Sequence, residues 1–413
     1  METLPTEVLT AEVLARCAEY APALRTVCRL WCAQATALAR RSKGRGLGFL
    51  SESGCGDLLA WVLEQRRAPF DARQVYRVLV SAARGGHLAL CLTARAWGGE
   101  LNLCGVATWN NMLHRAALGG HGSLCEELRA WGATAWDLML CGAAQGGHVL
   151  LCERACDLGA ADWDEMLCAA ALGGHLPLCE EARARGATRW NDMLDAAAEG
   201  GHTVLCEVAL IWGATDPNRM LNGAARGGHR RLCERARAAG ATDWNLMLYY
   251  AVRGGHVSLC ELAHAWGASD GDGLLCHAAS GGDAAPESYR AICLMMRSWG
   301  ATNWNGMLIS AAFSGCLSLC ELARDWGATD WNQMLRFAAK GGHGTVCDAA
   351  RAWGATNYSE MLFDAALAEH ITICLKAKEW GANWDDKMSR LVNIRGSRVL
   401  NELAQKWQRG EKA

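Results

Sequence analysis

A histidine and a cysteine recur together along the chain, four residues apart, and both side chains are common metal ligands. The pairs begin at His87, His121, His148, His175, His202, His229, His256, His343 and His370, and each is followed by a cysteine, from Cys91 to Cys374. On a helix this spacing puts both side chains on one face, but one pair supplies only two of the four ligands of a structural zinc site. We therefore expect no metal and no cofactor. The cysteines should pack as small hydrophobic side chains, and the histidines should hydrogen-bond the backbone across a repeat junction.

Tryptophan forms two further series in the same register. One series is Trp109, Trp136, Trp163, Trp190, Trp244, Trp304 and Trp331, and the other is Trp97, Trp131, Trp212, Trp266, Trp299, Trp326, Trp353 and Trp380. Stacked aromatic rings beside a basic groove would bind single-stranded nucleic acid. The charges beside the first series are mixed, as Asp162, Arg189 and Asp216 show, so we expect the tryptophans to pack between adjacent loops. The sequence has neither a phosphate-binding glycine loop nor a nucleophile elbow, and we predict that the protein is not an enzyme.

The 413 residues carry a formal net charge of −2, and 51% of them are hydrophobic. Such a chain can form a core and has no overall charge that attracts nucleic acid or an anionic membrane. It has 21 cysteines, no secretory signal, and no apolar run of the roughly 18 residues that span a bilayer. We therefore expect reduced thiols, a cytoplasmic location with the nucleus as an alternative, and a monomer with neither nucleic acid nor membrane among its partners.

These residues follow one period. The tripeptide Gly-Gly-His recurs every 27 residues from His121 to His256. Insertions near 99–107 and 283–289 interrupt the series. We divide the chain into an N-terminal segment, a degenerate first repeat, about eleven repeats, and a C-terminal capping repeat with its tail, at residues 1–42, 43–72, 73–383 and 384–413.

The unit 163–189 shows how one repeat is expected to fold. Asp164 is the expected N-cap of a first helix, which ends at Gly173-Gly174 because glycine readily adopts the left-handed conformation. A second helix is expected from about Leu176 to Ala184. Two helices this short bury their apolar faces only against neighbouring pairs. The sequence therefore predicts an all-α helical-repeat solenoid.

The repeated string Met-Leu-x-x-Ala-Ala-x-Gly-Gly-His-x-x-Leu-Cys resembles the ankyrin repeat. The matching positions are Met139-Leu140, Ala143-Ala144, Gly147-His148, Leu151-Cys152 and Gly159-Ala160. Ankyrin repeats have about 33 residues, so each unit lacks about six, which form a protruding β-turn finger in that family. Short repeats of this type resemble ankyrin proteins encoded by giant DNA viruses of amoebae. The resemblance implies an ankyrin-like, protein-binding solenoid in which the finger is reduced to a tight loop.

The first forty or so residues resemble the F-box. Leu4-Pro5-Thr6-Glu7-Val8-Leu9 is followed by the pair Val13-Leu14 and by Leu24-Arg25-Thr26-Val27-Cys28-Arg29-Leu30-Trp31. One residue is inserted before the pair, and the aromatic residue usual after it is absent. The resemblance implies three helices that dock on a Skp-family adaptor of a cullin–RING ubiquitin ligase through Leu4, Pro5, Val8, Leu9, Val13, Leu14, Leu24, Val27, Cys28 and Trp31. The alternative is an N-terminal helical cap on the solenoid.

Positions that vary between repeats are free to recognise a partner, whereas constant positions serve packing. The residue after Ala-Ala and the residue two before it should line a groove if the ankyrin alignment holds. The candidate target-binding residues are Leu118, Gln145, Leu172, Glu199, Arg226, Tyr249, Arg253, Phe313, Arg336 and Lys340. Their chemistry changes along the chain, which favours an unidentified target protein over a uniform polyanion; a solvated face with drifting sequence is the alternative.

Together these patterns predict a protein–protein interaction adaptor. The F-box resemblance implies a substrate receptor of an SCF-type cullin–RING ubiquitin ligase, in which the solenoid holds a target near the ubiquitin-charged enzyme. The alternative is a ubiquitin-independent scaffold or decoy that binds a host protein. Either function rests on binding, without chemistry by this chain itself.

Overall fold

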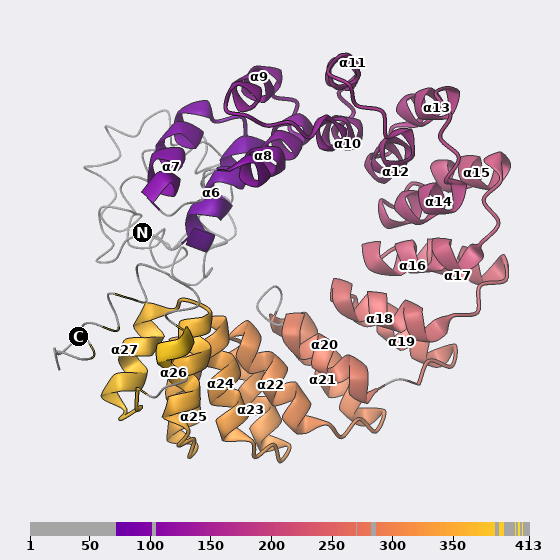
Figure 1. Cartoon of the computed structure of the whole chain (residues 1–413). Helices are drawn as coiled ribbons and strands as arrows, with labels where there is room; N and C mark the ends of the chain where they lie inside the picture. The colour runs from indigo at the N-terminus through magenta and orange to yellow at the C-terminus, as the bar shows by residue number, and fades with distance from the viewer. Residues whose placement is uncertain are drawn as a thin grey trace, which may run out of the picture. The chain divides into compact units, whose positions relative to one another are not determined.

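The computed structural model describes residues 72–100, 105–269, 271–281, 286–384 and 388–391, together with residues 401, 404 and 407. Every regular element among these residues is an α-helix (Figure 1). The all-α helical-repeat solenoid expected from the sequence is therefore confirmed. The chain divides into two compact units, which meet in sequence between Thr215 and Asp216, and each is described by itself.

In both units a first helix alternates with a second helix. In the N-terminal unit the first helices are α6 (Ala72–Arg84), α8 (Val106–Leu118), α10 (Trp136–Gly146), α12 (Trp163–Gly173) and α14 (Trp190–Glu199). Its second helices are α7 (Leu88–Glu100), α9 (Gly122–Ala130), α11 (Val149–Asp157), α13 (Leu176–Ala184) and α15 (Thr203–Trp212). The second helix expected over about 176–184 is therefore confirmed.

The C-terminal unit continues the alternation. Its first helices are α16 (Pro217–Gly227), α18 (Trp244–Gly254), α20 (Asp272–Gly281), α22 (Trp304–Ser314), α24 (Trp331–Gly341) and α26 (Tyr358–Leu367). Its second helices are α17 (Arg230–Ala238), α19 (Val257–Ala265), α21 (Pro286–Ser298), α23 (Leu317–Asp325), α25 (Gly344–Ala352) and α27 (Ile371–Glu379). The second helices α7 and α21 adjoin the two predicted insertions and have 13 residues each, whereas α13 has 9. No helix in the described part of the chain is both long and apolar enough to cross a membrane.

The helices of each unit pack in two layers. Within a unit, each first helix contacts the neighbouring first helices and the second helix of its own repeat, as α12 does with α10, α14 and α13. In the C-terminal unit the first helices from α16 to α26 likewise pack each against the next. Contacts therefore run between neighbouring repeats, as expected for a chain whose stability comes from repeat interfaces.

The core lies between the two layers and is built from the constant residues of the repeat. In α12 these residues are Met166, Leu167, Ala170 and Ala171, and in α13 they are Leu178, Cys179 and Ala182; all are buried. The alanines let adjacent first helices approach closely, while methionine and leucine supply most of the apolar area. Most of the described repeats bury the same residue types at these positions.

The glycine pair between the two helices is required by geometry at both positions. Gly174 has a φ of +86°, a left-handed conformation that β-carbons disfavour. A Cβ added at Gly173 would collide with the carbonyl oxygen of Gln145 in the preceding repeat. The first glycine therefore permits close contact between repeats, and the second permits the turn.

The N-cap expected at Asp164 is wrong. The helix α12 begins at Trp163, and its N-cap is Asp162, whose carboxylate accepts the N–H of Glu165 at 3.0 Å. An aspartate or asparagine caps α18, α22, α24 and α26 in the same way. The cap lies two residues before the position expected, because the tryptophan is already helical.

Asp164 instead joins two repeats. Its Oδ1 accepts the backbone N–H of Thr188 at 2.7 Å and that of Arg189 at 3.1 Å, in the loop that leads to α14. Residues at the equivalent position bond the following loop in the same way: Asn110, Asp137, Asn191, Asn218, Asn245, Asp272, Asn305, Asn332 and Ser359. These bonds satisfy backbone donors that the short loop leaves without a partner of its own.

Candidate binding surface on the first helices

The repeat histidines join neighbouring repeats by hydrogen bonds at the C-terminal ends of the first helices. His175 Nε2 lies 3.2 Å from the carbonyl oxygen of Gln145, and His202 Nε2 lies 3.1 Å from that of Leu172. Equivalent bonds of 2.9–3.2 Å join His121 to Arg84, His148 to Leu118, His256 to Arg226, His343 to Phe313 and His370 to Lys340. A carbonyl oxygen only accepts, so each Nε2 carries a proton and donates it. The predicted bond across the repeat junction is confirmed.

Where the Gly-Gly-His motif is lost, other side chains replace the histidine. The Tyr289 hydroxyl donates to the carbonyl oxygen of Arg253 at 2.8 Å, and the Ser314 hydroxyl donates to that of Ala279 at 3.1 Å. Neither residue was identified from the sequence. Tyr289 belongs to the second insertion, so no fixed spacing marks it, and Ser314 replaces the first glycine of the motif.

The tryptophans pack at the loop side of each repeat. Trp190, which begins α14, and Trp212, which ends α15, meet edge to face with ring centroids 5.4 Å apart. The guanidinium carbon of Arg183 in the preceding repeat lies 4.7 Å from the Trp212 ring centroid. Equivalent ring pairs are Trp109–Trp131, Trp244–Trp266, Trp304–Trp326 and Trp331–Trp353. The predicted packing role is confirmed, but the pair joins two helix ends of one repeat rather than adjacent loops.

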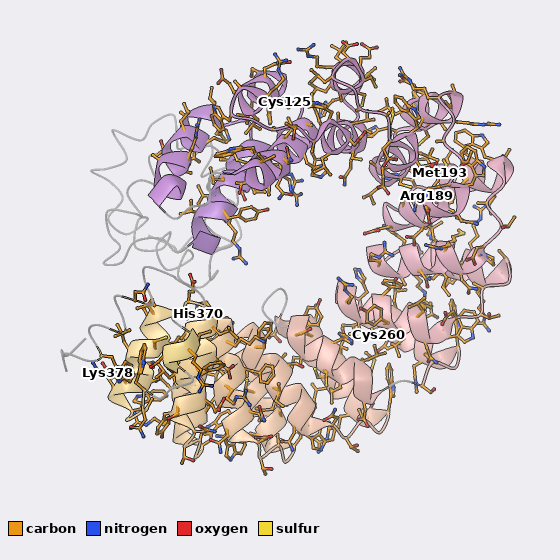
Figure 2. The ribbon with its side chains drawn as sticks, in the orientation of Figure 1. Cys125, Arg189, Met193, Cys260, His370 and Lys378 are labelled. Carbon is orange, nitrogen blue, oxygen red and sulfur yellow. The ribbon has the colours of Figure 1, made fainter. Side chains whose placement is uncertain are left out.

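The repeat cysteines are core side chains. Burial raises the pKa of the Cys179 thiol to about 12, and burial is also the main cause that raises the pKa of Cys125 and Cys260 to about 12. Figure 2 marks the last two on α9 and α19. A thiol that resists deprotonation is a poor metal ligand, so the predicted packing role is confirmed. Within the described ranges, no three His, Cys, Asp or Glu side chains gather in a way that would hold a metal ion.

In the N-terminal unit the variable positions of the first helices are apolar, neutral or acidic. Leu118, Gln145, Leu172 and Glu199 lie on α8, α10, α12 and α14, and all four are partly exposed. Three of them also present their carbonyl oxygens to the histidines described above. Their side chains are therefore free to vary, while their backbones are fixed by the repeat junction.

In the C-terminal unit the variable positions carry an aromatic–cationic cluster, consisting of Arg226, Tyr249, Tyr250, Arg253 and His277. The Tyr249 ring centroid lies 5.3 Å from that of Tyr250 and 5.2 Å from that of His277. The guanidinium carbon of Arg226 lies 4.6 Å from the Tyr250 centroid, and that of Arg253 lies 6.0 Å from the Tyr249 centroid. The structure thus brings together three residues predicted from the sequence, in one cluster with two that were not.

Tyr250 and His277 were missed because they occupy the position directly before Ala-Ala. In the four repeats directly before, this position holds small residues, namely Gly142, Ala169, Ala196 and Gly223. A Cβ at Gly142 would collide with the carbonyl oxygen of His114, so at that junction the position is used for close helix packing. The change from glycine or alanine to tyrosine and histidine was the signal that could have identified them.

The remaining candidates lie on the last first helices. Phe313 is 47% exposed, and its ring centroid lies 6.5 Å from that of Phe337. Arg336 Nε lies 2.9 Å from Asp364 Oδ2 within the stack, so its charge is balanced by a half-buried ion pair. Lys340 is exposed, and its carbonyl oxygen accepts the histidine bond of the next repeat. Of these three predicted residues, Phe313 and Lys340 are accessible to a partner.

All ten predicted adaptor-binding residues, from Leu4 to Trp31, lie outside the described residues. The same holds for the degenerate first repeat, 43–72, except Ala72, and for most of the C-terminal capping repeat. In that last segment Met388 and Leu391 are described and buried. The F-box resemblance therefore rests on the sequence.

No protein-family model matches the chain, and no curated protein is significantly similar to it. Among solved structures, the chain is similar to the pentatricopeptide repeat protein PPR10 from maize, at 16% identity and a TM-score of 0.29, over 100% of this chain and 77% of that one. A second structure of PPR10, in complex with an 18-nt psaJ RNA element, matches at 15% identity and a TM-score of 0.29, over 100% of this chain and 78% of that one.

This comparison corrects one expectation. The sequence-based exclusion of nucleic acid as a partner is wrong as it was drawn, because the matched structures of PPR10 include complexes with RNA. The exclusion rested on the absence of a net positive charge over the whole chain. Net charge says nothing about a local surface such as the aromatic–cationic cluster.

Proposed function

We propose that the chain is a binding adaptor whose first helices hold a target protein and whose F-box-like segment docks on a Skp-family adaptor of a cullin–RING ubiquitin ligase. One observation carries the first part of this proposal. The residues that join and fill the repeats are nearly constant, whereas accessible positions on the same helices change from Leu172 to Tyr249 to Phe313.

The constant residues explain why the surface can vary without loss of the fold. The histidine bonds use a backbone carbonyl of the preceding repeat, and the Asn or Asp bonds use backbone N–H groups of the following one. Neither bond depends on the identity of the side chain that faces solvent between them. Within each unit, such an array presents different chemistry at each repeat along a row of first helices, as repeat proteins that bind macromolecules do.

The second part of the proposal is supported by the sequence of residues 1–42. Eight or more apolar side chains in about forty residues are more than a segment of that size buries alone, and their order resembles the F-box. An adaptor of this kind contributes effective concentration: it holds the target close to the ubiquitin-charged enzyme and performs no chemistry itself. This function places the protein in the cytoplasm or the nucleus, and a chain of the giant-virus type would recruit the adaptor of its host.

The test is capture of a purified Skp-family adaptor by the full-length chain. The double variant Leu9→Asp with Trp31→Ala should abolish capture while the far-UV circular dichroism spectrum stays helical, because aliphatic and tryptophan anchors dominate such interfaces. The control is Lys340→Glu, an exposed change in the C-terminal unit, which should capture the adaptor normally. If the unmodified chain captures none, the ubiquitin-independent scaffold is the better assignment. If the double variant captures it normally, the F-box assignment is wrong.

A further inference from the structure

The aromatic–cationic cluster occupies three neighbouring first helices of the C-terminal unit. Arg226 lies on α16, Tyr249 and Arg253 on α18, and His277 on α20; α18 packs against both of the other helices. Arg253 and His277 are exposed, and Arg226 and the tyrosine are partly exposed. The cluster is therefore accessible, and it is formed by repeats that lie next to each other.

The acidic side chain on α20 does not balance the positive charge of Arg253. Asp272 accepts the backbone N–H groups of Thr302 and Asn303 at 2.6 and 3.0 Å, so its carboxylate serves the repeat junction. In the described part of the chain, no carboxylate forms an ion pair with Arg253. Its guanidinium carbon lies over the Tyr249 ring, 6.0 Å from the ring centroid. This arrangement leaves the N–H edge of the guanidinium able to bind an anion.

The row becomes apolar beyond the cluster. On α22, Ile309 is partly exposed and Phe313 is 47% exposed, and α22 packs against α20 on one side and α24 on the other. On α24, Arg336 is already paired with Asp364, whereas Lys340 is exposed. The positive charge of α16 to α20 is thus interrupted at α22 by aromatic and aliphatic surface before Lys340 follows on α24.

We propose that this row binds an extended peptide segment in which a block of Asp or Glu residues faces Arg226 and Arg253, and apolar residues next to that block cover Phe313. The inference rests on the proposed function and specifies the chemistry of the target. Charge complementarity accounts for the acidic block, and the apolar surface on α22 accounts for the change in chemistry next to it. A strand of uniform negative charge would match α16 to α20 and meet no positive partner at α22.

The length of the segment follows from the spacing of the helices. Packed helices lie 8–10 Å apart, so α16 to α22 spans roughly 24–30 Å. An extended chain covers about 3.3 Å per residue, which gives a contact segment of about seven to nine residues. A random library of 12-residue peptides is therefore long enough to contain the predicted contact segment at more than one position along the peptide.

The experiment is selection of such a library on the full-length chain, followed by fluorescence anisotropy of the selected peptides. Arg253→Glu is the test variant, and Arg231→Glu is the matched control, because Arg231 is an exposed arginine on the second helix α17 of the same unit. Selected peptides should contain an acidic block beside apolar residues. Their affinity should fall at least about tenfold in Arg253→Glu and stay within about twofold in Arg231→Glu, since charge-assisted hydrogen bonds are lost only in the first.

Arg253→Gln is a second variant that removes the charge without reversing it, and a loss of affinity in the same direction is expected. The proposal is overturned if the selected peptides are not enriched in Asp and Glu, or if they bind Arg253→Glu as tightly as the unmodified chain. It is equally overturned if a labelled 12-nucleotide oligouridine binds more tightly than every selected peptide and loses affinity in Arg253→Glu. Peptides without acidic residues that still bind would overturn this inference and leave the proposed function standing. If no peptide is selected and no Skp-family adaptor is captured, both fall.

Discussion

Replacing Asp164 should weaken one repeat junction without disturbing the helices on either side. The Oδ1 atom of Asp164 accepts the N–H groups of Thr188 and Arg189 at 2.7 and 3.1 Å. Asp164→Ala leaves both donors without a protein acceptor. Each hydrogen bond to a charged group contributes roughly 1.5–3 kcal/mol net. Because the loop is exposed, water replaces part of the lost hydrogen-bond energy. We therefore expect a loss of about 2 kcal/mol in local stability.

The matched control is Asp164→Asn. Asn191 occupies the equivalent position in the next repeat and accepts the N–H of Thr215 at 2.9 Å, so an asparagine oxygen is able to make this bond. The charge at the start of α12 is lost in this variant, and a negative side chain in the first turn contributes roughly 0.3–1 kcal/mol. We therefore expect Asp164→Asn to cost less than about 1 kcal/mol.

Hydrogen exchange of the Thr188 and Arg189 amides measures this loss directly, because those two N–H groups are the donors that lose their acceptor. A loss of about 2 kcal/mol accelerates exchange roughly 30-fold, since 1.4 kcal/mol corresponds to a factor of ten. Exchange in α10 should not change. If exchange at Thr188 and Arg189 is the same in Asp164→Ala as in the unmodified chain, or if the Ala and Asn variants are equally affected, the bond across the junction does not contribute as argued.

Two further predictions concern titratable groups. The backbone N–H groups of Thr302 and Asn303 hold the pKa of the Asp272 carboxyl below its usual value; its contribution to stability is therefore complete above about pH 3.9 and is lost as the pH falls through the lower folded-state pKa. Asp272→Asn should remove that pH dependence in acid unfolding curves of the C-terminal unit, and an unchanged curve would contradict this. Burial raises the pKa of the Cys179 thiol to about 12. Iodoacetamide at pH 8 should therefore modify Cys179 only after denaturation. Rapid labelling of Cys179 in the native chain would contradict this, because it would show that the thiol is accessible.

Much of the fold was predictable from the sequence because each repeat carries the same signals for where its helices begin and end. The glycine pair ends one helix, the spacing of Leu and Cys defines the next, and the second helix predicted at about 176–184 is observed at Leu176–Ala184. The histidine bond followed from a polar residue at a fixed place beside a repeat junction. Periodicity reveals such features because it repeats both partners of each contact.

Features that depend on contacts between repeats, or on breaks in the period, were not predictable in the same way. The N-cap rule considers only nearby residues, so it assigned Asp164 to its own helix although its partners lie 24 and 25 residues later. Tyr289 replaces a histidine from within an insertion, where the register is lost. The cluster around Tyr250 and His277 was only half identified, because the alignment with the ankyrin repeat directed attention to two positions and not to the one between them.

Hydrogen exchange of the variant Leu194→Asp tests most directly whether the chain is a linear stack of neighbouring repeats. Leu194 lies on α14 with 0% of its surface exposed, and a carboxylate at this position is buried without a partner, at a cost of several kcal/mol. In a linear stack only the local repeat should open, so amides from Trp190 to Ile211 should lose protection and become sensitive to protease, while α8, α10 and the helices of the C-terminal unit keep theirs. A uniform loss of protection throughout the described chain, with unfolding in one cooperative step, would contradict the repeat architecture on which the proposed binding surface depends.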